Sequence, residues 1–119
     1  MTTDPFAIVH AIGLAMPNVE LTTRYDGTRV LKAGGSFMAG MATDESAEAD
    51  SLVVRCAFDD RALMLEDAPD TYYVTEYYAK YPVVLVRLSQ VADDALRDLL
   101  NVSRKMALAK NRRAGPTRQ

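Results

Sequence analysis

The sequence predicts an α+β fold with two layers, an antiparallel sheet and helices on one of its faces, in the order α-β(3-4)-α-β2-α. Capping signals and helical periodicity coincide near both ends of the sequence. Between them lie short runs of branched and aromatic residues, separated by turns that contain glycine. Strands joined by such short turns pair antiparallel, so we expect helices on one face and a partly free second face.

The first helix is expected over residues 5–16. Asp4 can cap its free amides, and Pro5 at the first helical position costs no hydrogen bond. Pro17 should end the helix, because the residue before a proline is restricted to extended backbone. Apolar residues recur at helical spacing and predict a buried stripe of Phe6, Val9, Ile12 and Met16.

Two consecutive hairpins are expected next, with strands over residues 21–25, 28–33 and 36–42. The pairs Asp26-Gly27 and Gly34-Gly35 separate these strands, and glycine is typical of such tight turns. The polar and acidic segment 43–50 should form a loop before the next strand.

The following elements are a strand over residues 52–57, a short helix over 60–66, and a final hairpin. Asp59 or Asp60 should cap the short helix. The hairpin is expected to pair residues 72–75 with 83–88, with residues 77–82 as a longer connection.

The closing helix is the clearest element and is expected over residues 93–109. Acidic residues begin it, basic residues gather near its end, and both complement the helix dipole. Its predicted buried stripe contains Leu96, Leu99, Leu100, Ser103 and Met106. We therefore expect one domain over residues 1–110 and a basic, flexible tail over 111–119.

The composition indicates a globular protein, because 49% of the 119 residues are hydrophobic and 25% are charged. The apolar stretch of residues 6–16 has neither the basic flank and cleavage site of a signal peptide nor the length of a membrane span. A single cysteine, Cys56, cannot form an internal disulfide. The sequence therefore predicts a cytoplasmic protein without a membrane partner.

Charge is distributed unevenly along the chain, although the net charge is only −2. Residues 1–92 contain 7 Lys+Arg and 13 Asp+Glu, whereas residues 93–119 contain 7 and 3. The basic end can mark an interaction surface, and a solvated surface helix would give the same count.

The chemistry of catalysis is sparse in this sequence. His10 is the only histidine and has apolar neighbours along its helix, as expected of a packed or half-exposed side chain. Cys56 lies in an apolar strand, where a thiol usually behaves as a small hydrophobe. We therefore expect no enzyme activity, cofactor or metal, and only a pocket converging on His10 or Cys56 would favour an enzyme.

A cluster of tyrosines is the one unusual feature, since five of the six lie between residues 72 and 81. Tyrosine gives a large contact area at low entropy cost, so an exposed group can stack on bases or anchor a partner protein. The candidate contact residues are Tyr73, Tyr77, Tyr78 and Tyr81. We expect at least two of these rings to be accessible and to group on one surface.

Several segments together resemble the MmcQ/YjbR family of small bacterial proteins, from the first helix to about residue 112. The segments are Ala15-Met16-Pro17-Asn18-Val19-Glu20, Tyr25-Asp26-Gly27-Thr28, Leu52-Val53-Val54-Arg55, Tyr72-Tyr73-Val74-Thr75 and Tyr81-Pro82-Val83-Val84-Leu85-Val86-Arg87-Leu88. The resemblance implies a two-layer fold related to secretion-chaperone-like and CyaY-like folds. It also implies a largely unassigned function, with DNA binding through two hairpin wings proposed for the family.

Two binding functions follow from these observations. The first is weak, salt-sensitive DNA binding through the hairpin wings and the basic end, by Arg24, Arg29, Lys32, Lys80, Arg87, Lys105, Lys110, Arg112 and Arg113. The alternative is a module that binds a protein or a small ligand through the open sheet face and the tyrosine cluster, as a monomer or a homodimer.

Overall fold

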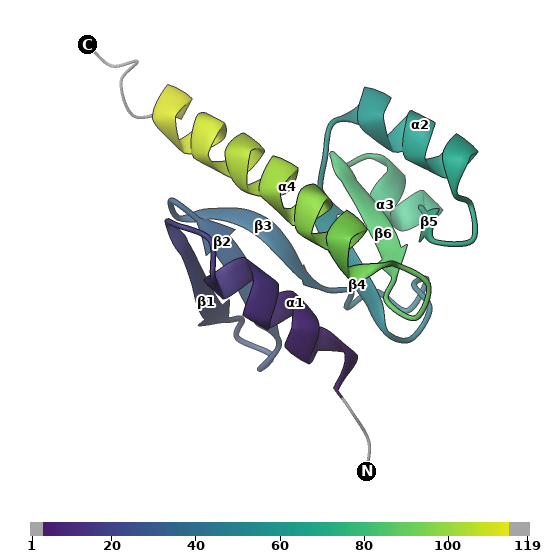
Figure 1. Ribbon diagram of the computed structural model, residues 1–119, viewed down its shortest axis with the longest axis horizontal. Coiled ribbons are helices and arrows are strands. Elements are labelled where there is room, and N and C mark those ends of the chain that lie inside the picture. Colours follow the sequence, from purple (N-terminus) through teal and green to yellow (C-terminus); the bar gives the residue numbers. More distant parts are fainter. Residues whose placement is uncertain (1–3, 115–119) are drawn as a thin grey trace.

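The structure, a computed structural model, describes residues 4–114, with side chains described through Lys110. It is an α+β fold of one six-stranded sheet and four helices (Figure 1). The elements are α1 (Pro5–Leu14), β1 (Val19–Thr23), β2 (Arg29–Ala33), β3 (Ser36–Met41), β4 (Ser51–Arg55), α2 (Phe58–Asp67), β5 (Tyr72–Tyr73), α3 (Glu76–Ala79), β6 (Val83–Arg87) and α4 (Asp93–Ala114).

All strand pairs are antiparallel, and the sheet order is β1-β2-β3-β4-β6-β5. The first four strands therefore form a meander, as the glycine turns predicted. Gly27, Gly34 and Gly35 have φ angles of 92°, 60° and 86°, a region that favours glycine, and they lie at the two tight turns. The hairpin of β5 and β6 completes the sheet beside β4.

One face of the sheet, called here the α4 face, carries the main hydrophobic core. Alternate residues of β4 and β6, such as Leu52, Val54 and Val84, point to this face and pack under α1 and α4. In Figure 1, α4 crosses the sheet with α1 beside it. The buried Ser103 hydroxyl of α4 donates a hydrogen bond to Met38 O at 2.7 Å, which ties this helix to β3.

The opposite face, called here the α3 face, has a second and smaller core of Val53, Val83, Leu85 and Tyr78. The sequence predicted only a connection over residues 77–82, whereas the structure places the helix α3 there, on a face expected to be partly free. A helix of four residues is too short to show a helical period, so no pattern could predict it. The face is therefore partly covered.

Several helix boundaries differ from the prediction. α1 ends at Leu14 rather than residue 16, and Asn18 then takes a φ of 66° to turn the chain into β1. α2 begins at Phe58, so Asp59 and Asp60 lie in its first turn and do not cap it. A negative charge is favourable both at the N-cap and in the first turn of a helix, so the sequence could not show which of these positions Asp59 and Asp60 occupy.

α4 runs over Asp93–Ala114, five residues beyond the predicted end. Ala107 is buried in the helix stripe, whereas the predicted Met106 is half-buried. The backbone of residues 111–114 continues the helix, and residues 115–119 of the expected tail lie outside the described residues. None of the helices in the described part is long and apolar enough to cross a membrane.

Candidate functional site

A groove of about 380 Å³ lies on the α3 face, between the strands and the tyrosine cluster. Its lining combines aromatic rings with three cationic side chains, and no Asp or Glu contributes to it. The lining residues are Arg24, Phe37, Met41, Thr43, Val53, Arg55, Tyr77, Tyr78, Tyr81, Pro82, Val83 and Lys110. In a protein with a net charge of −2, this concentration of positive charge indicates a site for an anion.

The aromatic wall of the groove comes from α3 and the residues after it. Tyr77 and Tyr81 are 46% and 44% exposed, with ring centroids 6.2 Å apart. The Lys80 ammonium lies over both rings, 5.6 Å from one centroid and 5.5 Å from the other. Two rings of the tyrosine cluster are therefore accessible on one surface, beside a cation.

Tyr78 is buried, unlike Tyr77 and Tyr81, and has a structural role. Its ring is only 7% exposed and meets Tyr77 edge-on, with centroids 4.9 Å apart. Its hydroxyl accepts hydrogen bonds from the backbone N–H groups of Thr43 and Asp44, at 3.2 and 3.1 Å. Tyr78 thus anchors α3 to the loop after β3 and holds the accessible tyrosines in place.

Arg55 supplies a cation from the middle of the sheet. Its Nε donates to Phe37 O at 2.7 Å, which fixes the plane of the guanidinium. Its two terminal nitrogens have no hydrogen-bond partner among the side chains and backbone described. Burial lowers the pKa of Arg55, and arginine nevertheless stays charged in proteins. The side chain is therefore a fixed, half-buried donor that faces the groove.

Arg24 reaches the groove from the end of β1 by lying across Gly40. Its Nη1 donates to Thr28 Oγ1 at 3.1 Å and to Met41 O at 3.2 Å. A Cβ at Gly40 would lie 3.0 Å from Nη2 of Arg24 and 3.4 Å from the Phe37 ring. The missing side chain at Gly40 therefore leaves room for both the Arg24 guanidinium and the Phe37 ring.

Lys110 completes the cationic lining from α4, the helix of the other layer. It is exposed and lies near the end of the described side chains. The groove thus joins residues that are 86 positions apart in the sequence, from Arg24 to Lys110.

The structure separates the other predicted DNA-binding residues from this groove. Arg29 lies on the α4 face, and Lys32 stands opposite Glu20 across β1 and β2. Arg87 is paired with Glu48 at 2.8 Å and lies over the Tyr73 ring. Lys105 is exposed on α4 outside the groove lining, and the side chains of Arg112 and Arg113 lie outside those described.

Arg55 and Phe37 were missed as site residues by the sequence analysis. The available signal was an arginine at the end of a run of branched residues, Leu52-Val53-Val54-Arg55, on the same face as Val53. For Phe37 there was no signal, because an aromatic residue in a strand usually belongs to the core.

Cavities also reach the two residues considered for catalysis. His10 lines a cavity on the α4 face, and no described carboxylate hydrogen-bonds to its ring. Cys56 is buried, and this burial raises the pKa of its thiol to about 11, which disfavours the nucleophilic thiolate. Within the described residues, no group of three or more His, Cys, Asp or Glu could hold a metal ion.

Comparisons with known proteins agree with this α+β class of fold. No model of a known protein family and no curated protein matches the chain. Among solved structures, the chain is similar to the crystal structure of protein DR2400 from Deinococcus radiodurans, which is described with the domain DUF419. The TM-score is 0.70 at 19% identity, over 92% of this chain and 84% of the other. The likeness shows a shared fold.

Proposed function

We propose that the protein is a non-enzymatic module of the cytoplasm that binds single-stranded nucleic acid in the groove on the α3 face. The observation that carries this proposal is the lining itself, in which accessible tyrosines stand beside three cations and no acid. Aromatic rings that stack on bases and cations that track phosphates are the two parts of a single-strand site.

Each part of a nucleotide has a matching group in the groove. A base can stack on the exposed rings of Tyr77 and Tyr81 when the Lys80 side chain moves off them toward a phosphate, and any base offers a face for stacking. The free terminal nitrogens of Arg55 suit a phosphate, because a guanidinium donates two parallel hydrogen bonds to it. The groove volume of about 380 Å³ is enough for about one nucleotide, with the rest of the strand on the surface.

A single strand suits this geometry better than a duplex does. The bases of a duplex are stacked on each other and cannot reach Tyr77 and Tyr81, whereas those of a single strand are free to do so. Arg24, Arg55 and Lys110 face a groove and do not project from the hairpins toward a duplex. In addition, residues 1–92 contain six more acidic than basic residues, 13 against 7. That excess would repel the wide phosphate surface of a duplex.

The resemblance to the MmcQ/YjbR family supports this proposal in part, whereas the structural neighbour contributes the shared fold alone. That family is related to DUF419, the domain with which the neighbour is described, and DNA binding is proposed for it. The proposal differs in its binding surface, since we place the nucleic acid on the α3 face and not on the hairpin wings.

The test is a fluorescence-anisotropy titration of a labelled 12-nucleotide oligothymidylate at low salt, with the duplex of the same length for comparison. Tyr81→Ala should weaken binding of the single strand by about tenfold, since stacking contributes about 1–3 kcal/mol per base. Lys110→Gln should weaken it by a smaller factor, because one phosphate contact is lost.

Matched controls are present in the same chain. Tyr25 is a fully exposed tyrosine outside the groove lining, and Lys105 is an exposed lysine of α4 outside it. Tyr25→Ala and Lys105→Gln should leave the affinity unchanged. The proposal fails if these controls weaken binding as much as the groove variants do, or if the duplex binds more tightly. Absence of binding to either oligonucleotide would favour a protein partner at the groove.

A further inference from the structure

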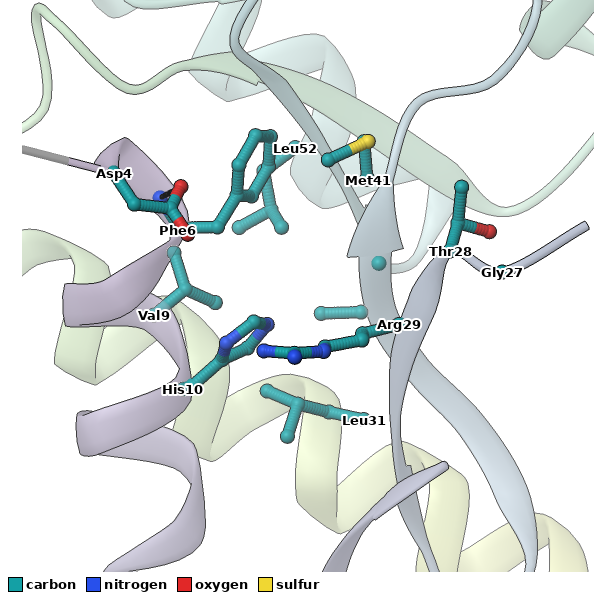
Figure 2. Close-up of a pocket in the computed structure, with 12 residues that line it drawn as sticks. Asp4, Phe6, Val9, His10, Gly27, Thr28, Arg29, Leu31, Met41 and Leu52 are labelled. Atoms are coloured by element: carbon teal, nitrogen blue, oxygen red, sulfur yellow. Dashed lines mark hydrogen bonds between the residues drawn. The ribbon is translucent and has the colours of Figure 1, made fainter. Parts of the chain in front are cut away.

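A second cavity lies on the α4 face, between α1 and the strands β2 and β3, and has a volume of about 290 Å³. Figure 2 shows its apolar wall, in which Phe6 and Val9 of α1 face Leu31 and Leu52 of the sheet. These four side chains are buried and belong to the main core. The floor of the cavity is therefore apolar, and because these side chains are at most 6% exposed, a ligand would reach them only by entering between α1 and the sheet.

The rim of this cavity is polar. Figure 2 shows the guanidinium of Arg29 beside the imidazole of His10, with Asp4 at the opposite side. Asp4 is occupied as the cap of α1, because its Oδ1 accepts the Phe6 N–H at 3.0 Å. Arg29 has no hydrogen bond or ion pair to any residue of the described part. The rim thus presents one unpaired cation above an apolar floor.

The surroundings of His10 agree with positive charge at this rim. Burial and then the charge of Arg29 lower the pKa of His10, and the charge of Asp4 raises it. His10 is therefore mostly neutral at pH 7, and its ring can donate one hydrogen bond. A ligand group at this point meets a permanent cation and a neutral donor.

We infer that this cavity binds a small monocarboxylate with an apolar tail, the carboxylate on Arg29 and His10 and the tail on the floor between α1 and the sheet. A guanidinium pairs two nitrogens with two carboxylate oxygens, a geometry that suits this group. The volume of about 290 Å³ suits a ligand of about six to eight carbons, the carboxylate carbon included. This site shares only Met41 with the lining of the groove, and the inference does not depend on the proposed function.

The test uses sodium hexanoate and hexan-1-ol, which share the tail and differ in the charged group. Amide chemical shifts of the labelled protein are followed by NMR at pH 7 during each titration. Hexanoate should cause saturable shifts at Phe6, His10 and Arg29, with an affinity about tenfold or more above that of the alcohol. Inorganic phosphate has no tail and should cause no saturable shift.

Two variants should change the affinity for hexanoate in opposite directions. Arg29→Gln should lower the affinity for hexanoate to about that for hexan-1-ol. Asp4→Asn keeps a good capping residue and removes a negative charge from the rim, so it should raise the affinity about twofold to threefold. Lys32→Gln alters the same strand outside the cavity lining and serves as the control.

Equal binding of acid and alcohol, or an unchanged affinity in Arg29→Gln, would overturn the inference. Weaker binding in Asp4→Asn would also overturn it, because the site would then favour a cation. Amide dispersion in the same spectra shows that each variant is folded. Arg29→Gln should leave oligonucleotide binding unchanged, so failure of this inference and failure of the proposed function are distinguishable.

Discussion

Arg55 illustrates how a single residue can serve binding more than stability. Its guanidinium lies among the apolar side chains of the α3 face and is held by one hydrogen bond to Phe37 O. Partial burial disfavours the charged form, as the lowered pKa of Arg55 indicates. A charge kept in such a place is typical of a functional site, although structural networks also retain such charges.

Replacement of this residue should separate the two roles. Arg55→Met should change the free energy of unfolding by no more than about 1 kcal/mol, because the lost hydrogen bond is offset by relief of the desolvation cost. The same variant should weaken oligothymidylate binding about tenfold. Urea denaturation and anisotropy measure the two quantities. A large loss of stability with unchanged binding would show that Arg55 is a structural residue.

Among the elements, α4 is the one that the sequence specified best. Acidic residues at its start and an apolar stripe every three to four residues agree on one helix, and Leu96, Leu99, Leu100 and Ser103 are all buried as predicted. Its end was predicted five residues early. Basic residues are favourable near the end of a helix, but they are also compatible with further helical turns, so they do not mark the last residue. The apolar periodicity therefore predicted which face of α4 is buried, but it did not predict where the helix ends.

The two leucines of α4 should differ in cost when they are truncated. Leu100 is completely buried, whereas Leu99 is 9% exposed and lines a shallow cavity with Cys56 and Met64. Leu99→Ala should therefore destabilise the protein by about 2–3 kcal/mol and Leu100→Ala by about 3–5 kcal/mol. Urea denaturation of the two variants gives the comparison. A cost below about 0.5 kcal/mol for Leu99→Ala would mean that the stripe is misplaced.

The elements of the α3 face were the hardest to predict. β5 has two residues and α3 has four, and neither length can show a period. The burial of Tyr78 also depends on the backbone of residues 43 and 44, which only the folded chain brings near it. Composition identified the tyrosine cluster, but it could not assign an anchoring role to Tyr78 or a surface role to Tyr77 and Tyr81.

At the scale of the whole molecule, the groove depends on contacts between distant segments. Its cations come from the end of β1, the end of β4 and the last turns of α4, so the sequence could name Arg24 and Lys110 without placing them together. Sheet alternation explains the residues that proved to be elsewhere. Arg29 lies two positions before Leu31 in β2, so both side chains point to the α4 face. The sequence could not predict this face for Arg29, because it did not show which alternate residues of β2 are buried under α4.

The basic residues 111–119 follow directly after Lys110, which lines the groove, so we expect them to strengthen binding there. Three groove cations would give a slope of log affinity against log salt of about −2, at about −0.7 per contact for a single strand. Residues 111–119 contain three further arginines, at positions 112, 113 and 118. Because these arginines follow Lys110 in the sequence, we expect each to add one phosphate contact, and the intact chain should then show a slope of about −4.

Removal of residues 111–119 should bring this slope back to about −2, with the thermal midpoint changed by only a few degrees. The last residues of α4 that pack on the main core are Ala107 and Leu108, so the truncation leaves the packing of both sheet faces intact. Anisotropy titrations of oligothymidylate across a salt series measure the slope for both chains. An unchanged slope would mean that the groove alone contacts the strand. If binding disappeared entirely in the truncated chain, the arginines, and not the groove, would be the binding site.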